Sequence, residues 1–179
     1  MKSLSEILQV SPEDFFAYVS TIRYGYKDRS GKLHFREDAD FSNCNYVFSS
    51  CEEVVANHCA WCWEIAELTK QYCAHHNIPC QSWFMEYRST ELHQTHTQVF
   101  ALYKGKWCPT PDNCLGIKLG EHGFDECEAS VQWFTDFFID YLKAVLKDRY
   151  DPKNLFVKEY ACSFMSGITD EEYLRQIRA

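Results

Sequence analysis

The sequence predicts an α+β fold in which helices come first, a small antiparallel sheet follows, and a further helix packs on that sheet. Three observations lead to this prediction. Apolar residues recur at helical spacing between residues 61 and 76, and they alternate at period two between 80 and 87. The turn signal Lys104-Gly105-Lys106 then joins two segments of strand character, and a long amphipathic stretch occupies residues 129–150.

Two helix starts in the first third of the chain are marked by capping residues. Ser11 precedes Pro12 and two acidic residues, so a helix is predicted to begin at residue 12. Ser50 and Glu53 have the spacing of a capping box, which predicts a short helix that ends near Asn57.

The segments around these helices are placed by their polarity and by breaker residues. Residues 24–45 are polar and are predicted to be irregular, apart from a loose hairpin at 29–32. The helix predicted at 61–76 is stopped by Pro79 and the two residues before it.

The predicted sheet has three strands. The first two lie at 80–87 and 96–103 and are rich in aromatic and β-branched residues. A third begins at Trp107 and is cut short by Pro109, because proline cannot donate to the strand ladder. A glycine-containing loop is predicted at 115–128.

Two helices are predicted after the sheet. The first occupies 129–150 and ends at Asp151-Pro152, and the second is short and occupies 169–177. The buried stripe of the first is predicted to consist of Val131, Phe134, Phe138, Tyr141, Leu142 and Val145.

Composition limits the classes of function. The 179 residues suit a single domain, 1–179, with its core at about 50–115. A net charge of −8 without a basic run argues against nucleic acid. No segment reaches the ~20 apolar residues of a membrane helix, and residues 1–10 lack a signal-peptide core, so a cytoplasmic location with no membrane partner is expected. The ten cysteines are then expected to be reduced.

Cys62 is the candidate nucleophile. It lies in the first turn of the helix predicted at 61–76, where unpaired backbone amides and the helix dipole favour an anion. The sequence therefore predicts a lowered thiol pKa, and the same amides are placed to stabilise an oxyanion.

His96 and Asp112 are the candidate base and orienting residue. His96 opens the second predicted strand, and Asp112 follows the turn after that strand. A three-residue turn would pair Tyr103 with Trp107 and place the two side chains on one face as diagonal neighbours. A two-residue turn would place them on opposite faces unless a bulge near Pro109 corrects the register.

The segment from residue 60 to 112 resembles the transglutaminase-like superfamily of cysteine peptidases and acyltransferases. Residues 61–66 (WCWEIA) resemble its nucleophile helix, and residues 77–80 (NIPC) resemble its helix-to-strand step. Residues 96–99 (HTQV), followed by Gly105-Lys106-Trp107 and Pro111-Asp112, are similar to its histidine and aspartate hairpin.

This resemblance implies a transglutaminase-like core with Cys62 as nucleophile, His96 as base and Asp112 as orienting residue, and no metal or organic cofactor. The implied activity is hydrolysis or acyl transfer on a peptide, protein or small amide through a thioester. The flanking domains of the large animal enzymes have no counterpart here, which favours a small hydrolase or acyltransferase over a crosslinking enzyme. The oligomeric state is not readable from the sequence.

Two rival chemistries use the same cysteines. Cys59 and Cys62 have the C-x-x-C spacing of a thiol–disulfide oxidoreductase, but that chemistry requires a strand leading into the motif, where residues 49–58 look helical or turn-like. A zinc site of the finger type would need a second closely spaced pair of ligands, and Cys108 and Cys114 are too far apart in the sequence to form one. The residues from which it could be drawn are His58, Cys59, Cys62 and either Cys108 or Cys114, or the pair His93 and His96.

Three further alternatives remain open at this point. The order Cys, His, Asp is shared by arylamine N-acetyltransferases, although their Arg-Gly-Gly lead-in is absent. A catalytically inactive binding module could keep the same fold. Asn113 could replace Asp112 as the orienting residue, and Asn57 could donate a hydrogen bond to the oxyanion. His75 and His76 are expected at the surface.

Overall fold

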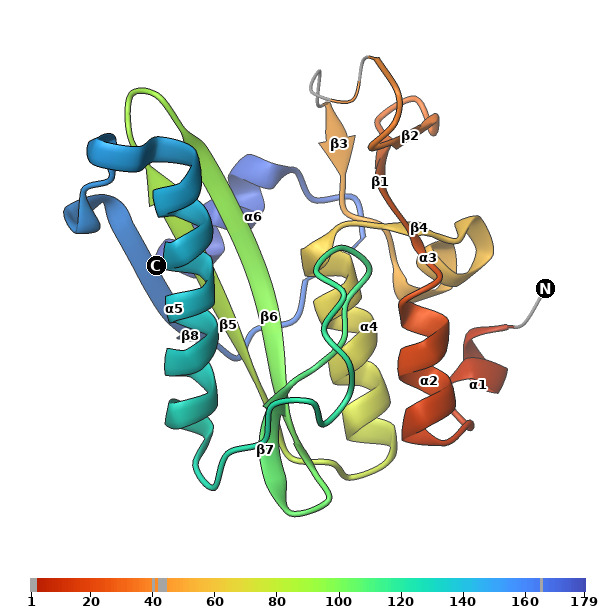
Figure 1. Ribbon diagram of the computed structural model, residues 1–179. Helices are drawn as coiled ribbons and strands as arrows, with labels where there is room; N and C mark the ends of the chain where they lie inside the picture. The colour runs from red at the N-terminus through yellow and green to blue at the C-terminus, as the bar shows by residue number, and fades with distance from the viewer. Residues whose placement is uncertain (1–2, 40, 42–44, 165) are drawn as a thin grey trace.

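The computed structural model describes residues 3–39, 41, 45–164 and 166–179 (Figure 1). Helices and two small, mainly antiparallel sheets confirm the predicted α+β class. None of the helices described is both long enough and apolar enough to cross a membrane. The elements are, in chain order, α1 (Leu4–Ile7), α2 (Pro12–Val19), β1 (Arg23–Asp28), β2 (Leu33–Phe35), β3 (Tyr46–Val47), α3 (Cys51–Asn57), β4 (Cys59–Ala60), α4 (Cys62–His75), β5 (Cys80–Arg88), β6 (His93–Tyr103), β7 (Lys106–Pro109), α5 (Cys127–Leu146), η1 (Lys147–Arg149), η2 (Pro152–Asn154), β8 (Leu155–Tyr160) and α6 (Asp170–Arg178).

The helix starts follow the local capping signals. Ser11 accepts a hydrogen bond from the backbone N–H of Asp14 at the start of α2. Ser50 and Glu53 form the predicted capping box at the start of α3, and a further capping box begins α6 at Thr169. These caps can be predicted from the sequence because each needs only residues within one turn of the helix.

Strands β1 and β2 of the first sheet lie almost entirely in the segment 24–45, which was predicted to be irregular. The hairpin of β1 and β2 is confirmed, and β1 also pairs antiparallel with β3 and parallel with β4. Gly25 is required in β1, since a Cβ there would lie 2.2 Å from the carbonyl oxygen of His34. The prediction missed β1 because only Tyr24 and Tyr26 interrupt its polar residues, and Gly25 between them is typical of a turn. Residues 40 and 42–44 of the predicted segment lie outside the described residues.

The second sheet is antiparallel with the strand order β7-β6-β5-β8. Figure 1 shows α5 in front of this sheet and α6 behind it. Met85 and Tyr87 of β5 pack with α5, whereas Phe84 packs with α6 and the start of α4. Neighbouring residues of β5 therefore serve two different cores, as the alternation of side chains in a strand requires. The edge strand β8 was not predicted.

The buried face of α5 is narrower than predicted. Phe134 and Leu142 are fully buried, but Tyr141 is 46% exposed and Val145 is 44% exposed. The helix touches the sheet along one line, so residues about 100° away from that line remain in solvent. The helix itself ends at residue 146, and a single 3₁₀ turn, η1, follows it.

The turn between β6 and β7 has two residues. Tyr103 pairs with Lys106 rather than with Trp107, and the three-residue turn considered above does not occur. Lys104 and Gly105 both have positive φ, 50° and 77°, as the tight hairpin turn requires. Pro109 ends β7, as predicted, so β6 has no strand partner on this edge before Val99.

Candidate active site

Cys62 is the first residue of α4 and is 6% exposed. Cys62 lines a small void of about 10 Å³ whose walls include Thr97, Gln98 and Asp112. A space of this size is at the lower limit for one water molecule. The candidate nucleophile is therefore at the predicted helix end, but it is almost fully buried.

The backbone around Cys62 is held by Glu64. Its buried carboxylate accepts hydrogen bonds from the backbone N–H of Trp61 (2.8 Å) and of Ser49 (2.7 Å). Burial raises the pKa of Glu64 to about 7, and the two amides oppose that rise. Glu64 thus joins the start of α4 to the strand-to-helix connection before α3.

His96 lies on β6 and directs Nε2 at two oxygen atoms. Asp112 Oδ2 is 3.6 Å from His96 Nε2, and Gln98 Oε1 is 3.4 Å from it. The ring stacks on Phe134 of α5, with 5.4 Å between the ring centroids. Two acceptors facing Nε2 favour the tautomer protonated there, which leaves the lone pair of Nδ1 as the basic site.

The open edge of β6 explains how Asp112 reaches His96 despite the two-residue turn. Val99 accepts a hydrogen bond from the backbone N–H of Thr110 on this edge, so Thr97, two residues away, directs its N–H to the same edge. Because β7 has ended at Pro109, Asp112 is not bound by the strand register. It can therefore approach His96 around the edge rather than across one face.

Asp112 is fixed by the residues that follow it. Its Oδ1 accepts hydrogen bonds from the backbone N–H of Cys114 (2.9 Å) and of Leu115 (2.8 Å), and the Cys114 thiol donates to Oδ2 over 3.2 Å. The neighbouring Asn113 is turned away, with Nδ2 donating to the carbonyl of Ala60 over 2.8 Å. Asp112, and not Asn113, therefore faces the imidazole.

Cys62 and His96 are both uncharged in this arrangement. Burial raises the pKa of the Cys62 thiol to about 12, although hydrogen bonding from the backbone amides of Thr97 and Trp63 opposes the rise. Burial also lowers the pKa of His96, against the charge of Asp112. The lowered thiol pKa predicted from the helix position is not found, because desolvation outweighs the helix amides. No hydrogen bond joins Cys62 to His96 among the described residues.

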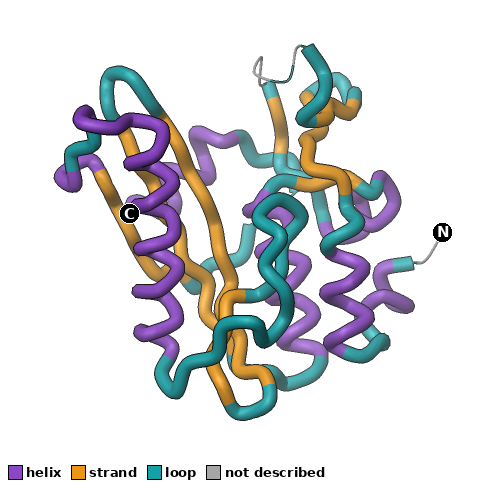
Figure 2. The backbone as a smooth tube through the Cα atoms, in the orientation of Figure 1, coloured by secondary structure: helices purple, strands orange, loops and turns teal. Residues whose placement is uncertain are grey.

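The loop of residues 110–126 covers this site. Figure 2 shows it as a long teal segment that runs from β7 towards the start of α4 and then returns to α5. Pro111 and Asp112 border both the void at Cys62 and an outer cavity of about 550 Å³. A substrate entering the outer cavity would therefore meet this short segment before the thiol.

Gln98 is a site residue that the sequence reasoning missed. Its Nε2 donates to the carbonyls of Val99 and Thr110, each over 2.8 Å, which leaves Oε1 facing His96. The sequence contained a signal for this role, because Gln98 lies two residues after His96 on the same predicted strand and such residues share a face. Glu64 was also missed, and its spacing of three from Trp61 resembles a capping box.

The rival cysteine arrangements are only partly supported. The two-residue strand β4 contains Cys59 itself, and the residues before it form α3 and its cap His58, so they are helical or turn-like as expected. Cys59 Sγ lies against Gly25 of β1, and burial raises the pKa of Cys59 to about 12.

The predicted zinc sets are not brought together. Cys108 donates to the carbonyl of Ala101, and His93 binds Glu86 over 2.7 Å. Within the described chain, the metal-ligating group that does assemble is His96, Asp112 and Cys114. Asn57 is exposed at the end of α3, and His75 and His76 are exposed as expected.

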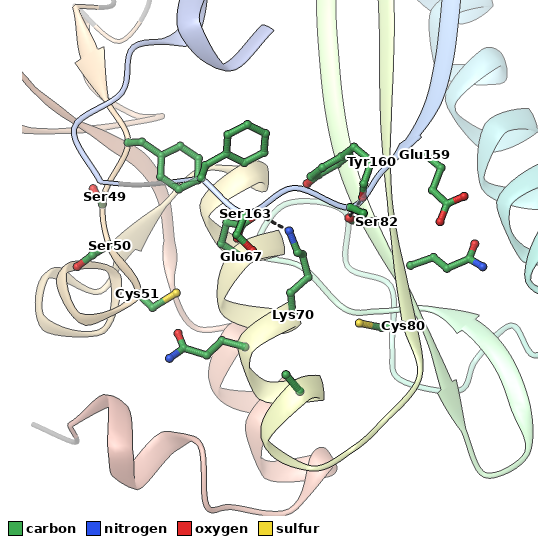
Figure 3. A pocket seen from close by; sticks show the side chains of 16 residues that line it. Ser49, Ser50, Cys51, Glu67, Lys70, Cys80, Ser82, Glu159, Tyr160 and Ser163 are labelled. Atoms are coloured by element: carbon green, nitrogen blue, oxygen red, sulfur yellow. Dashed lines mark hydrogen bonds and ion pairs between the residues drawn. The ribbon is translucent and has the colours of Figure 1, made fainter. Parts of the chain in front are cut away.

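A second open cavity lies on another side of α4 (Figure 3). It measures about 530 Å³ and contains Lys70, which donates to Glu67 (2.7 Å) and to the carbonyl of Cys162 (2.8 Å). Its described lining residues include Cys51 and Cys80 but no histidine. Its two thiols therefore have no imidazole partner among the described lining residues.

Comparisons with known proteins add no family. No protein-family model matches the chain, and no curated protein sequence matches it.

Proposed function

We propose that this protein is a cysteine-dependent amide or peptide hydrolase or acyltransferase with a transglutaminase-like core. Cys62 is the nucleophile, His96 the base and Asp112 the residue that orients His96. The observation that carries the proposal is the 3.6 Å approach of Asp112 to His96 Nε2 beside the first turn of the helix that begins with Cys62.

Three parts of the fold support a transglutaminase-like assignment. A helix with cysteine at its first residue packs against an antiparallel sheet, and the histidine lies on the strand next to it. The aspartate follows the next strand. The three residues come from separate segments of the chain, so their meeting is not a consequence of sequence proximity.

The proposed reaction begins when His96 Nδ1 takes the proton of Cys62 and the thiolate attacks an amide carbonyl. Asp112 stabilises the imidazolium through Nε2. The backbone N–H groups of Thr97 and Trp63 already favour negative charge at Sγ. His96 then returns the proton to the leaving amine, and water or an amine releases the acyl group from the thioester.

The site must open for this reaction. The small void at Cys62 is far smaller than an amide group, and the adjoining outer cavity is separated from it by Pro111 and Asp112. Opening would also hydrate the thiol and reduce the burial that raises its pKa. The closed form is thus a resting state of the proposed enzyme.

The buried thiol also favours one competing function, a binding module that keeps the fold without catalysis. The two functions differ in whether Cys62 ever becomes acylated. The outer cavity of about 550 Å³ would then be the binding site by itself.

Acylation by p-nitrophenyl acetate separates these functions. Wild type should release a burst of one p-nitrophenolate per chain, and mass spectrometry should place the acetyl group on Cys62. The burst should vanish in Cys62→Ser, and its rate should fall by about 10²–10⁴-fold in His96→Ala. Cys162→Ser is the matched control, because Cys162 is an exposed thiol.

A burst carried by Cys162, or an acetylation rate of Cys62 that ignores His96, would reject the enzyme in favour of the binding module.

A further inference from the structure

Three possible metal ligands converge beside Cys62. His96 Nε2, Asp112 Oδ2 and Cys114 Sγ all lie within 4.8 Å of one another. Two of the separations are 3.6 Å, from Nε2 to Oδ2, and 3.2 Å, from Sγ to Oδ2. Cys114 has no part in the reaction proposed above, and its thiol is turned into the site rather than to solvent.

These separations suit a tetrahedral zinc ion. Zinc bonds of about 2.0 Å to nitrogen and oxygen and about 2.3 Å to sulfur place neighbouring ligands roughly 3.3–3.5 Å apart. Imidazole, carboxylate and thiolate are all common zinc ligands. The three side chains would therefore need only small adjustments to bind the ion.

The three ligands are also partly held in position before a metal binds, and one side of the group faces a cavity. Asp112 is held through Oδ1 by the amides of Cys114 and Leu115, so Oδ2 remains for the metal. Asp112 and Cys114 both line the outer cavity of about 550 Å³. An ion could reach the ligands from that cavity, and water could supply a fourth ligand.

We propose that Zn²⁺ binds to His96, Asp112 and Cys114 and thereby switches off the Cys62 site. The metal site rests on the geometry, whereas its inhibitory effect rests on the proposed function. Binding replaces the S–H proton of Cys114, and one proton is released to solvent. The proton on the imidazole moves from Nε2 to Nδ1, so His96 remains neutral but can no longer accept the proton of Cys62.

Zinc binding is tested first in Cys62→Ser, where no nucleophile is needed. Calorimetric titration with zinc chloride should show one ion per chain. Cys62→Ser/Cys114→Ser should bind it far more weakly, by more than the roughly 10–100-fold that loss of an outer partner costs. Cys62→Ser/Cys162→Ser is the control and should bind zinc normally. Co²⁺ should give a thiolate charge-transfer band that disappears with Cys114.

Absence of binding, or equal binding without Cys114, would overturn the metal site. In wild type, one equivalent of zinc should stop acylation of Cys62, and a chelator should restore it. Zinc that binds without slowing acylation would overturn the inhibitory role alone. A Cys62 that is never acylated in the presence of chelator would reject the proposed function and the inhibitory role with it, while the metal site would stand.

Discussion

Two cavities lie beside α4, and they differ both in volume and in the side chains that line them. The void at Cys62 holds about 10 Å³ and adjoins the residues proposed for catalysis. The pocket at Lys70 holds about 530 Å³, and its described lining offers an ion pair but no imidazole. In the closed form, reactive groups and available volume are therefore separated along one helix.

This difference shows where the control of the proposed enzyme lies. The pocket at Lys70 already holds about 530 Å³, whereas the void is bounded by Pro111 and Asp112 of the loop 110–126. In the proposed enzyme, the loop both supplies the orienting carboxylate and excludes substrate. Changes in this loop should affect reactivity, and equivalent changes around Lys70 should not.

Asp112→Asn should have the largest effect. The amide oxygen can still accept from the amides of Cys114 and Leu115, so the loop should keep its position. The amide N–H₂ would then face His96 Nε2 and favour the tautomer with the proton on Nδ1. The acylation burst should slow by about 10²–10⁴-fold.

The urea midpoint provides the structural control for this variant and should change little. A normal burst rate in Asp112→Asn would show that the carboxylate does not orient the base.

Glu64→Gln should lower stability. At pH 5, where the contribution of Glu64 to stability is still nearly full, one of the two backbone N–H groups would face the amide N–H₂ instead of an oxygen, which should cost about 1–3 kcal/mol in urea unfolding. Glu52→Gln, at an exposed position of α3, is the control. An equal loss in both variants would refute the role given to Glu64.

The pH dependence of stability should change in the same variant. The pKa of Glu64 is raised from 4.5 to about 7 in the folded protein, so the folded state holds an extra proton between these values. Its contribution to stability is full below pH 4.5 and is lost as the pH rises through about 7. Urea unfolding at several pH values should show this loss in wild type and not in Glu64→Gln.

Asn113→Ala should increase the reactivity of Cys62. The variant removes the hydrogen bond from Nδ2 to the carbonyl of Ala60 that holds the loop to β4. Because such a hydrogen bond contributes about 1 kcal/mol net to stability, the loop 110–126 should open ~5-fold more often without it. Iodoacetamide labelling of Cys62, followed by peptide mass spectrometry, measures this change.

Asn154→Ala, in η2, provides the comparison and should label Cys62 at the wild-type rate. Equal labelling rates in Asn113→Ala and wild type would mean that the hydrogen bond of Asn113 does not limit access of the reagent to Cys62.

Gly105→Ala should have the smallest effect. Gly105 has a φ of 77° in the two-residue turn, a region that disfavours a side chain. Thermal unfolding should show a loss of about 1 kcal/mol. Lys104→Asn should be neutral or slightly stabilising, since asparagine tolerates positive φ. A destabilised Lys104→Asn would contradict this account of the turn.

The sequence predicted elements whose signals are local. The starts of α2, α3 and α6 depend on Ser11, Ser50 and Thr169, and each cap is complete within four residues. The strand at Cys80–Arg88 was found from its own alternation. Such features need no knowledge of distant contacts.

The geometry of the site depended on contacts that are distant in the sequence. The approach of Asp112 to His96 required the early end of β7, which lets the two side chains meet at an edge of the sheet despite the two-residue turn. The raised thiol pKa of Cys62 depends on burial by the loop and not on its helix position. The missed strand β8 is an edge element that β5 orders by pairing with it.

The contact between Tyr173 and Thr97 has a consequence for synthesis of the protein. The hydroxyl of Tyr173 in α6 lies 2.7 Å from Oγ1 of Thr97, directly beside His96 in the sequence. Translation proceeds from the N-terminus, so Cys62, His96 and Asp112 are made long before α6. A nascent chain would hold all three residues before α6 can pack behind β6, and we expect Cys62 to take its buried position only after α6 has docked.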